Sequence, residues 1–173
     1  IDKDTSGLLV VAKNDAAHLS LSAQIAEKTC RREYLALCEG IFKEDTGRIE
    51  TYIGRSPSDR VKMAVVPKEK GKYALTEYEV QARYAEGFTL ARFRLYTGRT
   101  HQIRVHCRYI GHPVVGDPVY GSKKQKFHLA GQLLHACRLE LTHPRTGERM
   151  SFEAPLPAYF TDVLSRLERG GRV

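Results

Sequence analysis

The stretch from Tyr96 to Pro113 is the feature that most constrains what this chain can fold into. A strand-like aromatic segment, residues 88–96, stops at a Thr-Gly pair. A helix is then predicted from Thr100, a hydroxyl residue typical of helix N-caps, to Gly111, a typical helix stop. One side of this helix carries Ile103, His106, Cys107 and Ile110, and another carries His101, Arg104 and Arg108. The pattern predicts a short helix that buries one face and presents imidazole and guanidinium groups on the other. A surface helix with solvated arginines would show the same pattern.

Length and composition indicate a single soluble globular domain, residues 1–173, with an adequate core. No apolar run approaches the ~20 residues that span a membrane, and no secretory signal is visible. The four cysteines, Cys30, Cys38, Cys107 and Cys137, are widely spaced without a C-x-x-C pair. This spacing favours reduced thiols in a cytoplasmic protein. Because the chain starts at Ile1 rather than Met, we expect an N-terminally truncated fragment.

An excess of Lys and Arg points to a polyanionic partner. The formal net charge is +8, and nucleic acid is the simplest partner for such a chain, although a basic protein without that partner would have the same composition. Residues 55–62, 68–72 and 123–126 are basic and loop-like. They fit either solvated hairpin tips or a rim that contacts phosphates, and the overall charge favours the rim.

The remaining patterns predict a mostly antiparallel sheet with flanking helices. A helix is predicted from Asn14 or Asp15 to about Lys28, with Leu19, Ala23, Ile25 and Ala26 on its apolar side. Strands are predicted at residues 8–12 (short and buried), 31–39, 48–53, 61–66, 73–82, 88–96, 133–141 and 149–153. A last helix is predicted over residues 158–169, after Pro157. Together these elements indicate an α+β fold.

Few side chains lie in a sequence pattern that is typical of a catalytic or metal-binding site. Asp2 and Asp4 precede the predicted strand at residues 8–12, where a carboxylate would be held rigidly, although Asp is also common in turns. Tyr34 lies inside a predicted strand, as a core residue or as a ring that stacks on a base. The seven histidines lack metal-ligand spacing, and neither a G-x-S-x-G elbow nor a phosphate-binding Gly-rich loop is present.

At these residues the chain resembles the RluA-type RNA pseudouridine synthases. Residues 2–13 resemble the catalytic motif of that family, which begins His-Arg-Leu-Asp and continues into Thr-Ser-Gly. Ile1 stands here at the leucine position, and the preceding His and Arg are absent because the sequence begins after them. Residues 32–36 resemble the tyrosine motif of the family. Residues 98–106, 111–117 and 120–121 resemble its third motif, and residues 134–136 and 143–144 fit the later strand and turn.

The resemblance implies the pseudouridine synthase fold and isomerisation of uridine to pseudouridine in RNA. By this match Asp2 is the essential carboxylate, as a nucleophile or as an aid to elimination, and Arg104 is its partner. Tyr34 would pack on the uracil and take part in proton removal at carbon 5, and Leu134 would form an apolar wall under the base. Arg99, His101 and Gln102 would support RNA or the loop. The resemblance implies neither a metal nor an organic cofactor.

Two other functions fit parts of the pattern. A non-catalytic RNA-binding or RNA-chaperone module could use the same scaffold, but the combination of Asp2, Tyr34 and Arg104 argues against it. A DNA-binding protein would be expected to carry a groove-reading motif, and none is present. The overall pattern is most similar to large-subunit ribosomal RNA synthases of the RluD or RluC kind, where an upstream RNA-binding domain of S4 type is common. We therefore expect RNA, in particular ribosomal RNA, as the partner, and a monomer as the working assumption.

Overall fold

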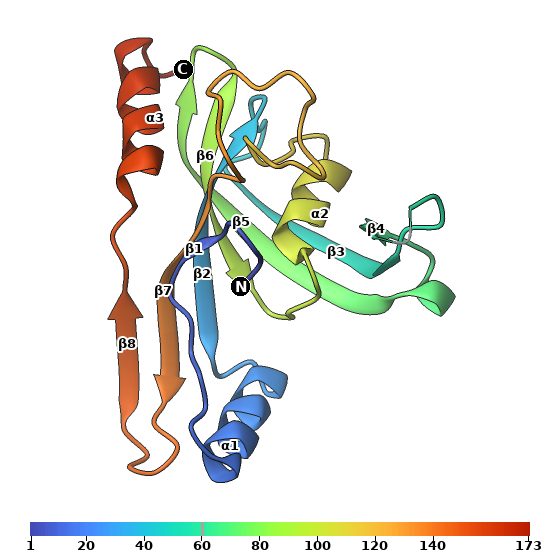
Figure 1. Cartoon of the computed structure of the whole chain (residues 1–173), viewed down its shortest axis with the longest axis vertical. Helices are drawn as coiled ribbons and strands as arrows, with labels where there is room; N and C mark the ends of the chain where they lie inside the picture. Colours follow the sequence, from blue (N-terminus) through green and yellow to red (C-terminus); the bar gives the residue numbers. More distant parts are fainter. Residues whose placement is uncertain (60) are drawn as a thin grey trace.

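A computed structural model describes residues 1–59 and 61–173 of the chain. In this part eight strands form one sheet in the order β1-β7-β2-β6-β5-β3-β4, with β8 paired to β7 (Figure 1). The pairing of β1 with β7 is parallel, and the other pairings are antiparallel. The α+β prediction with a largely antiparallel sheet is confirmed.

Most elements lie where the sequence predicts them. The strands are β1 (Ser6–Gly7), β2 (Arg31–Glu39), β3 (Thr46–Arg55), β4 (Met63–Val65), β5 (Lys72–Tyr84), β6 (Phe88–Leu95), β7 (Leu134–Thr142) and β8 (Arg149–Glu153). The helices are α1 (Asp15–Ala26), α2 (Gln102–Tyr109) and α3 (Ala158–Arg169), with a short 3-10 turn at Lys68–Lys70. The basic loop predicted at residues 55–62 includes Arg60, which lies outside the described residues.

The strand predicted at residues 8–12 is absent, and only Ser6–Gly7 pairs with β7. Beyond Ala136 the free edge of β7 is occupied by β8, which pairs with residues 138–142. The chain after Gly7 therefore has no strand edge to join. Leu9 and Val11 are 63% and 72% exposed, so the predicted burial of this segment is also wrong.

Helix α1 has the predicted limits but not the predicted buried face. Asn14 caps the helix by accepting a hydrogen bond from the Ala17 N–H. Leu19 and Ile25 are exposed, whereas Leu21 and Gln24 are buried. The Gln24 amide donates to the Thr142 carbonyl at 2.8 Å and accepts from the Thr142 N–H at 2.7 Å. This amide pairing at the end of β7 turns Gln24, rather than Leu19, toward the sheet.

Helix α2 lies across the sheet and is buried along most of its length (Figure 1). Its N-cap is His101, in a left-handed conformation with φ of 57°, so the predicted start at Thr100 is wrong. The predicted end is confirmed, because the chain leaves the helix through Gly111 with φ of +83°. Ile103 and Cys107 join the core formed with β2 and β6. Arg104 is also buried, which contradicts the alternative interpretation of a surface helix with a solvated arginine at this position.

Beneath α2, His106 links the helix to two strands. Its ring nitrogens lie 2.8 Å from the hydroxyls of Thr51 on β3 and Thr76 on β5. The side chain is fully buried, and burial lowers the pKa of His106 to about 4. The neutral ring therefore fastens α2 to strands β3 and β5.

Acidification is expected to destabilise the fold through His106. Between its folded pKa of about 4 and the unfolded value of 6.5, the unfolded chain binds more protons than the folded protein. The free energy of unfolding contributed by this group is complete above pH 6.5 and is lost as pH falls through that window, by about 2 kcal/mol between pH 7.5 and pH 5. Urea unfolding of wild type and His106→Gln at both pH values measures it.

The exposed His18 on α1 supplies the matched control. His18→Gln should retain the wild-type loss of stability on acidification, and His106→Gln should lose less. Equal pH dependence in wild type and His106→Gln would contradict the assignment.

Candidate functional site

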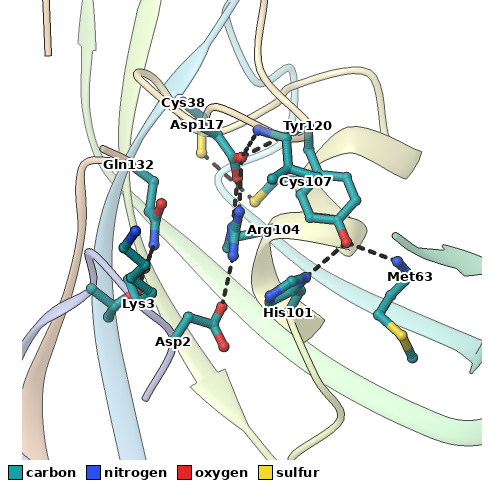
Figure 2. A network of polar contacts seen from close by, with 12 residues as sticks. Asp2, Lys3, Cys38, Met63, His101, Arg104, Cys107, Asp117, Tyr120 and Gln132 are labelled. Atoms are coloured by element: carbon teal, nitrogen blue, oxygen red, sulfur yellow. Dashed lines mark hydrogen bonds and ion pairs between the residues drawn. The ribbon is translucent and has the colours of Figure 1, made fainter. Parts of the chain in front are cut away.

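Asp2 is held by a tight turn that leads into β1. The Thr5 N–H donates to the Asp2 carbonyl at 3.1 Å, and Asp4 occupies the left-handed position of the turn with φ of 66°. The Gln132 amide donates to the Lys3 carbonyl at 2.7 Å (Figure 2). Gly7 is required where the turn joins β7, since a Cβ there would lie 2.2 Å from the Ala136 carbonyl oxygen. A rigid turn thus positions the Asp2 carboxylate, and Asp4 is a turn former, as predicted.

Arg104 lies between two carboxylates at the centre of the site (Figure 2). Its Nη1 donates to Asp2 Oδ2 at 3.2 Å, and its Nε and Nη2 donate to Asp117 at 2.7 and 3.0 Å. The exposed fractions of the three side chains are 4% for Arg104, 23% for Asp2 and 0% for Asp117. Burial opposes its charge, but the bonds to Asp117 and Asp2 raise the pKa of Arg104 above its ordinary value. The predicted contact between Asp2 and Arg104 is therefore present, with Arg104 fully ionised.

Tyr34 reaches the same region from β2. It pairs with Phe93 on β6 and Ala136 on β7, at the point where the β2–β7 register shifts between Glu33 and Tyr34. Such irregularities are common where a strand re-aims a side chain beside an active site. Burial raises the pKa of the Tyr34 hydroxyl, Arg32 opposes this and Asp2 reinforces it. The hydroxyl is a neutral phenol at neutral pH.

These side chains meet at a cleft of about 280 Å³. Its walls include Asp2, Tyr34, Leu134, Arg99 and Gln102, with Ile1, Thr5, Arg32, Leu95, Gly98, Thr100 and Ile103. Arg104 is not among the lining residues and contacts Asp2 from behind. A larger hollow of about 910 Å³ lies between residues 8–13 and strands β7 and β8, but its lining is mainly apolar and includes none of the predicted site residues. The smaller cleft is the candidate active site.

The three residues predicted to support RNA or the loop have different positions. The Gln102 amide lines the cleft, but all four of its hydrogen-bonding positions are used within the protein, with Leu75, Thr76, Thr97 and Arg99. Gln102 therefore supports the loop. Arg99 lines the cleft and donates from Nε to the Tyr73 carbonyl at 2.9 Å. His101 does not line the cleft, and its Nδ1 lies 2.9 Å from the Tyr120 hydroxyl.

Asp117 and Tyr120 are site residues to which sequence reasoning gave no role. The Tyr120 hydroxyl accepts from the Met63 N–H at 3.0 Å, and its ring lies against the Arg104 guanidinium, 5.1 Å from centroid to Cζ. Burial lowers the pKa of the neighbouring His101, and the Arg104 charge lowers it further. Asp117 and Tyr120 both lie in the residues that resemble the third motif of the family, 111–117 and 120–121. That resemblance was the sequence signal that could have identified them as site residues.

The described residues were compared with the requirements of a metal site and of a membrane-spanning helix, and they meet neither. The described residues contain no group of three or more His, Cys, Asp or Glu side chains that could hold a metal ion. Among residues 1–59 and 61–173, no helix combines the length and apolar character needed to cross a bilayer. All four cysteines are free and buried.

Comparison with known proteins gives a consistent result. Residues 1–109 match the family described as RNA pseudouridylate synthase. The chain is 50% identical over 171 residues to the "Uncharacterized RNA pseudouridine synthase YlyB" of Bacillus subtilis, covering 99% of this chain and 55% of that protein. It is 49% identical over 182 residues to the "Ribosomal large subunit pseudouridine synthase D" of Neisseria meningitidis serogroup A, covering 98% and 48%. The chain thus spans about half the length of the curated relatives it matches.

A solved structure has the same fold. "Human RNA Pseudouridylate Synthase Domain Containing 1" superposes with a TM-score of 0.78 at 30% identity, covering 97% of this chain and 78% of that chain.

Substitution of Arg104 is expected to lower the free energy of unfolding more than substitution of Asp2. Arg104→Ala leaves the fully buried Asp117 carboxylate without its bidentate partner, which should cost about 3–5 kcal/mol. Asp2→Asn removes one partly exposed charge and keeps a hydrogen-bond acceptor, so its cost should stay within about 1 kcal/mol. Urea unfolding at pH 7.5 measures both values. Equal losses for the two variants would contradict the central position of Arg104.

Proposed function

The chain belongs to the RNA pseudouridylate synthase family, and from that premise we propose that the protein isomerises uridine in RNA to pseudouridine, with Asp2 as its essential carboxylate. The observation that carries this proposal is the Asp2 carboxyl group, held at 3.2 Å by a buried arginine at the wall of a cleft that Tyr34 and Leu134 also line. A carboxylate with a fixed direction and limited water is suited to covalent or general-base chemistry.

The proposed reaction requires the Asp2 carboxyl group to lie next to the ribose of the target uridine. The bond between uracil and ribose is broken, the uracil rotates, and carbon 5 is joined to the ribose. Asp2 either attacks the ribose or assists elimination to a glycal. Arg104 binds Oδ2, and within the described residues Oδ1 has no protein partner, so one oxygen remains available for the substrate.

Tyr34 and Leu134 supply the surroundings of the base. Leu134 lies on β7, beside the strand that carries Tyr34, and offers an apolar wall. The Tyr34 ring packs against the uracil in this proposal. Because its hydroxyl is a neutral phenol, it accepts the carbon 5 proton only while passing on its own, and acts as a relay.

Large-subunit ribosomal RNA is the proposed substrate class, in the cytoplasm. Support comes from relatives whose names state that activity and from the net charge of +8. The target base must leave its stack to reach Asp2, which costs a few kcal/mol. Contacts between basic side chains and phosphates offset that cost.

Asp2→Asn is expected to abolish isomerisation while leaving RNA binding nearly unchanged. An amide has the same size but is neither a nucleophile nor a base, so the loss belongs to the chemical step. The measurement is tritium release from carbon 5 of labelled uridine in ribosomal RNA, with the full-length protein. Asp4→Asn in the same turn is the control and should retain activity. Wild-type release from Asp2→Asn would favour a non-catalytic RNA-binding module instead.

RNA affinity is expected to fall steeply with salt, because Lys and Arg contacts release counterions. Lys123 and Lys124 are exposed in a loop at the opposite end of the molecule from the β7–β8 turn (Figure 1). The double change Lys123→Glu/Lys124→Glu should reduce the slope of log affinity against log salt by roughly 1–2 and leave the single-turnover rate nearly unchanged. Filter binding at several salt concentrations gives the slope.

Arg145→Glu in the exposed β7–β8 turn reverses a charge far from that loop and should keep the wild-type slope. A flat salt dependence in wild type would contradict an electrostatic RNA interface.

A further inference from the structure

Arg32 lies in the cleft beside Tyr34, and the proposed reaction gives it no role. On β2 it pairs with Leu95 of β6, two residues before the pair formed by Tyr34 and Phe93. Since side chains alternate across a strand, Arg32 and Tyr34 point to the same face of the sheet. Both line the cleft of about 280 Å³. A guanidinium group therefore stands close to the place proposed for the uracil.

The sheet supplies no acid for this guanidinium group. Arg32 forms no ion pair with a carboxylate of the described residues, and its Nε is buried without a hydrogen-bond partner. Its neighbours on β2 differ, because Arg31 and Glu33 point to the opposite face and form an ion pair there. Glu33 also binds Arg92 on that face, at 3.2 Å. Acids of the sheet thus compensate the arginines of the opposite face but not Arg32.

Arg99 brings a second guanidinium group to the same cleft. The preceding residue, Gly98, lies against Arg32, since a Cβ at that position would lie 2.8 Å from Arg32 Nη1. Arg99 is anchored by the bond from its Nε to the Tyr73 carbonyl, and it too has no ion pair with a described carboxylate. Two like charges therefore line one small cleft, an arrangement that an anion bound in the cleft would stabilise.

We propose that Arg32 and Arg99 form a binding site for the phosphate groups on either side of the target uridine. The assignment of the phosphates to that uridine rests on the proposed function. Asp2 is the one acid among the described residues that line the cleft, and it already accepts from Arg104. The anion must therefore come with the substrate. Uracil is neutral, whereas each nucleotide inside an RNA chain carries a phosphodiester at both ends, and guanidinium groups bind phosphate well.

The position of this site suits the extrusion of the base. Taking a base out of its stack costs free energy that contacts with the protein must offset. Basic side chains on the outer surface contact the RNA whether or not the base is extruded. Arg32 and Arg99 lie in the cleft itself, so they reach the flanking phosphates only when the nucleotide has entered it. Their contacts therefore favour the extruded conformation in particular.

The test compares two ligands of the full-length protein by NMR titration at low salt. Uridine 3′,5′-bisphosphate carries both phosphates, and uridine carries none. Wild type should bind the bisphosphate at least about 10-fold more tightly, the scale of one charge-assisted hydrogen bond. Arg32→Gln should weaken binding of the bisphosphate about 10-fold and binding of uridine by less than about 2-fold. Arg99→Gln should give the same pattern.

Arg31→Gln is the matched control, because this neighbouring arginine points to the opposite face and should bind both ligands as wild type does. Arg32→Lys keeps the positive charge and should stay within about 3-fold of the wild-type affinity for the bisphosphate. Equal losses for uridine and the bisphosphate in Arg32→Gln would overturn the proposal. Equal affinity of wild type for the two ligands would overturn it without any variant.

This outcome is separate from that of the isomerisation assay, because ligand binding needs no turnover. A preference for the bisphosphate that depends on Arg32, in a protein that releases no tritium from RNA, would retain the phosphate site and reject the proposed function. Isomerisation by a protein without that preference would retain the function and reject the phosphate site.

Discussion

The burial of the Arg104 charge is the constraint on which the rest of the site depends. Removing a guanidinium from water costs several kcal/mol unless carboxylates compensate it with good geometry. Here Arg104 lies on α2, and the compensation comes from two other parts of the chain: Asp117 in the turn after that helix and Asp2 in the N-terminal turn. The buried side chains of Arg104 and Asp117 satisfy one another through two hydrogen bonds, and Asp2 adds a third bond to Arg104. The pairing that stabilises their association therefore also sets the direction of the carboxylate on which the proposed chemistry depends.

The sheet supplies the other half of the cleft. Tyr34 and Leu134 lie on adjacent strands, with Tyr34 opposite Ala136 and Ala36 opposite Leu134. Since side chains alternate across a strand, Tyr34 and Ala36 share the face that packs beneath α2. The register shift beside Tyr34 leaves one residue of β7 unpaired at that point. The part of the cleft formed by Tyr34 and Leu134 lies on the sheet, and Arg104 lies on α2. His106 joins the helix to the sheet through Thr51 and Thr76.

Local pattern predicted the elements that depend on local energetics. The strand at residues 31–39, the cap at Asn14 and the stop at Gly111 can each be predicted from a few neighbouring residues, and all three are confirmed. The errors arise where tertiary competition decides. Residues 8–12 have the composition of a buried strand, but β8 already occupies the edge they would need. The apolar Leu19 is exposed because the polar Gln24 pairs with the end of β7. The third motif contains Asp117 and Tyr120, but their contacts with Arg104 form only in the folded chain, so their roles were not predicted.

The same hydrogen bonds indicate whether the protein or the RNA would change shape during the proposed reaction. The Gln102 amide has no remaining hydrogen-bonding capacity, and the Asp117 carboxylate accepts four bonds. Moving either group would break several buried hydrogen bonds at once, each costing about 1–3 kcal/mol if left unsatisfied. Flipping one nucleotide out of its stack costs a few kcal/mol in total. In the proposed reaction, deforming the RNA therefore costs less free energy than deforming the protein, and a rigid cleft of about 280 Å³ is suited to receive a single extruded base.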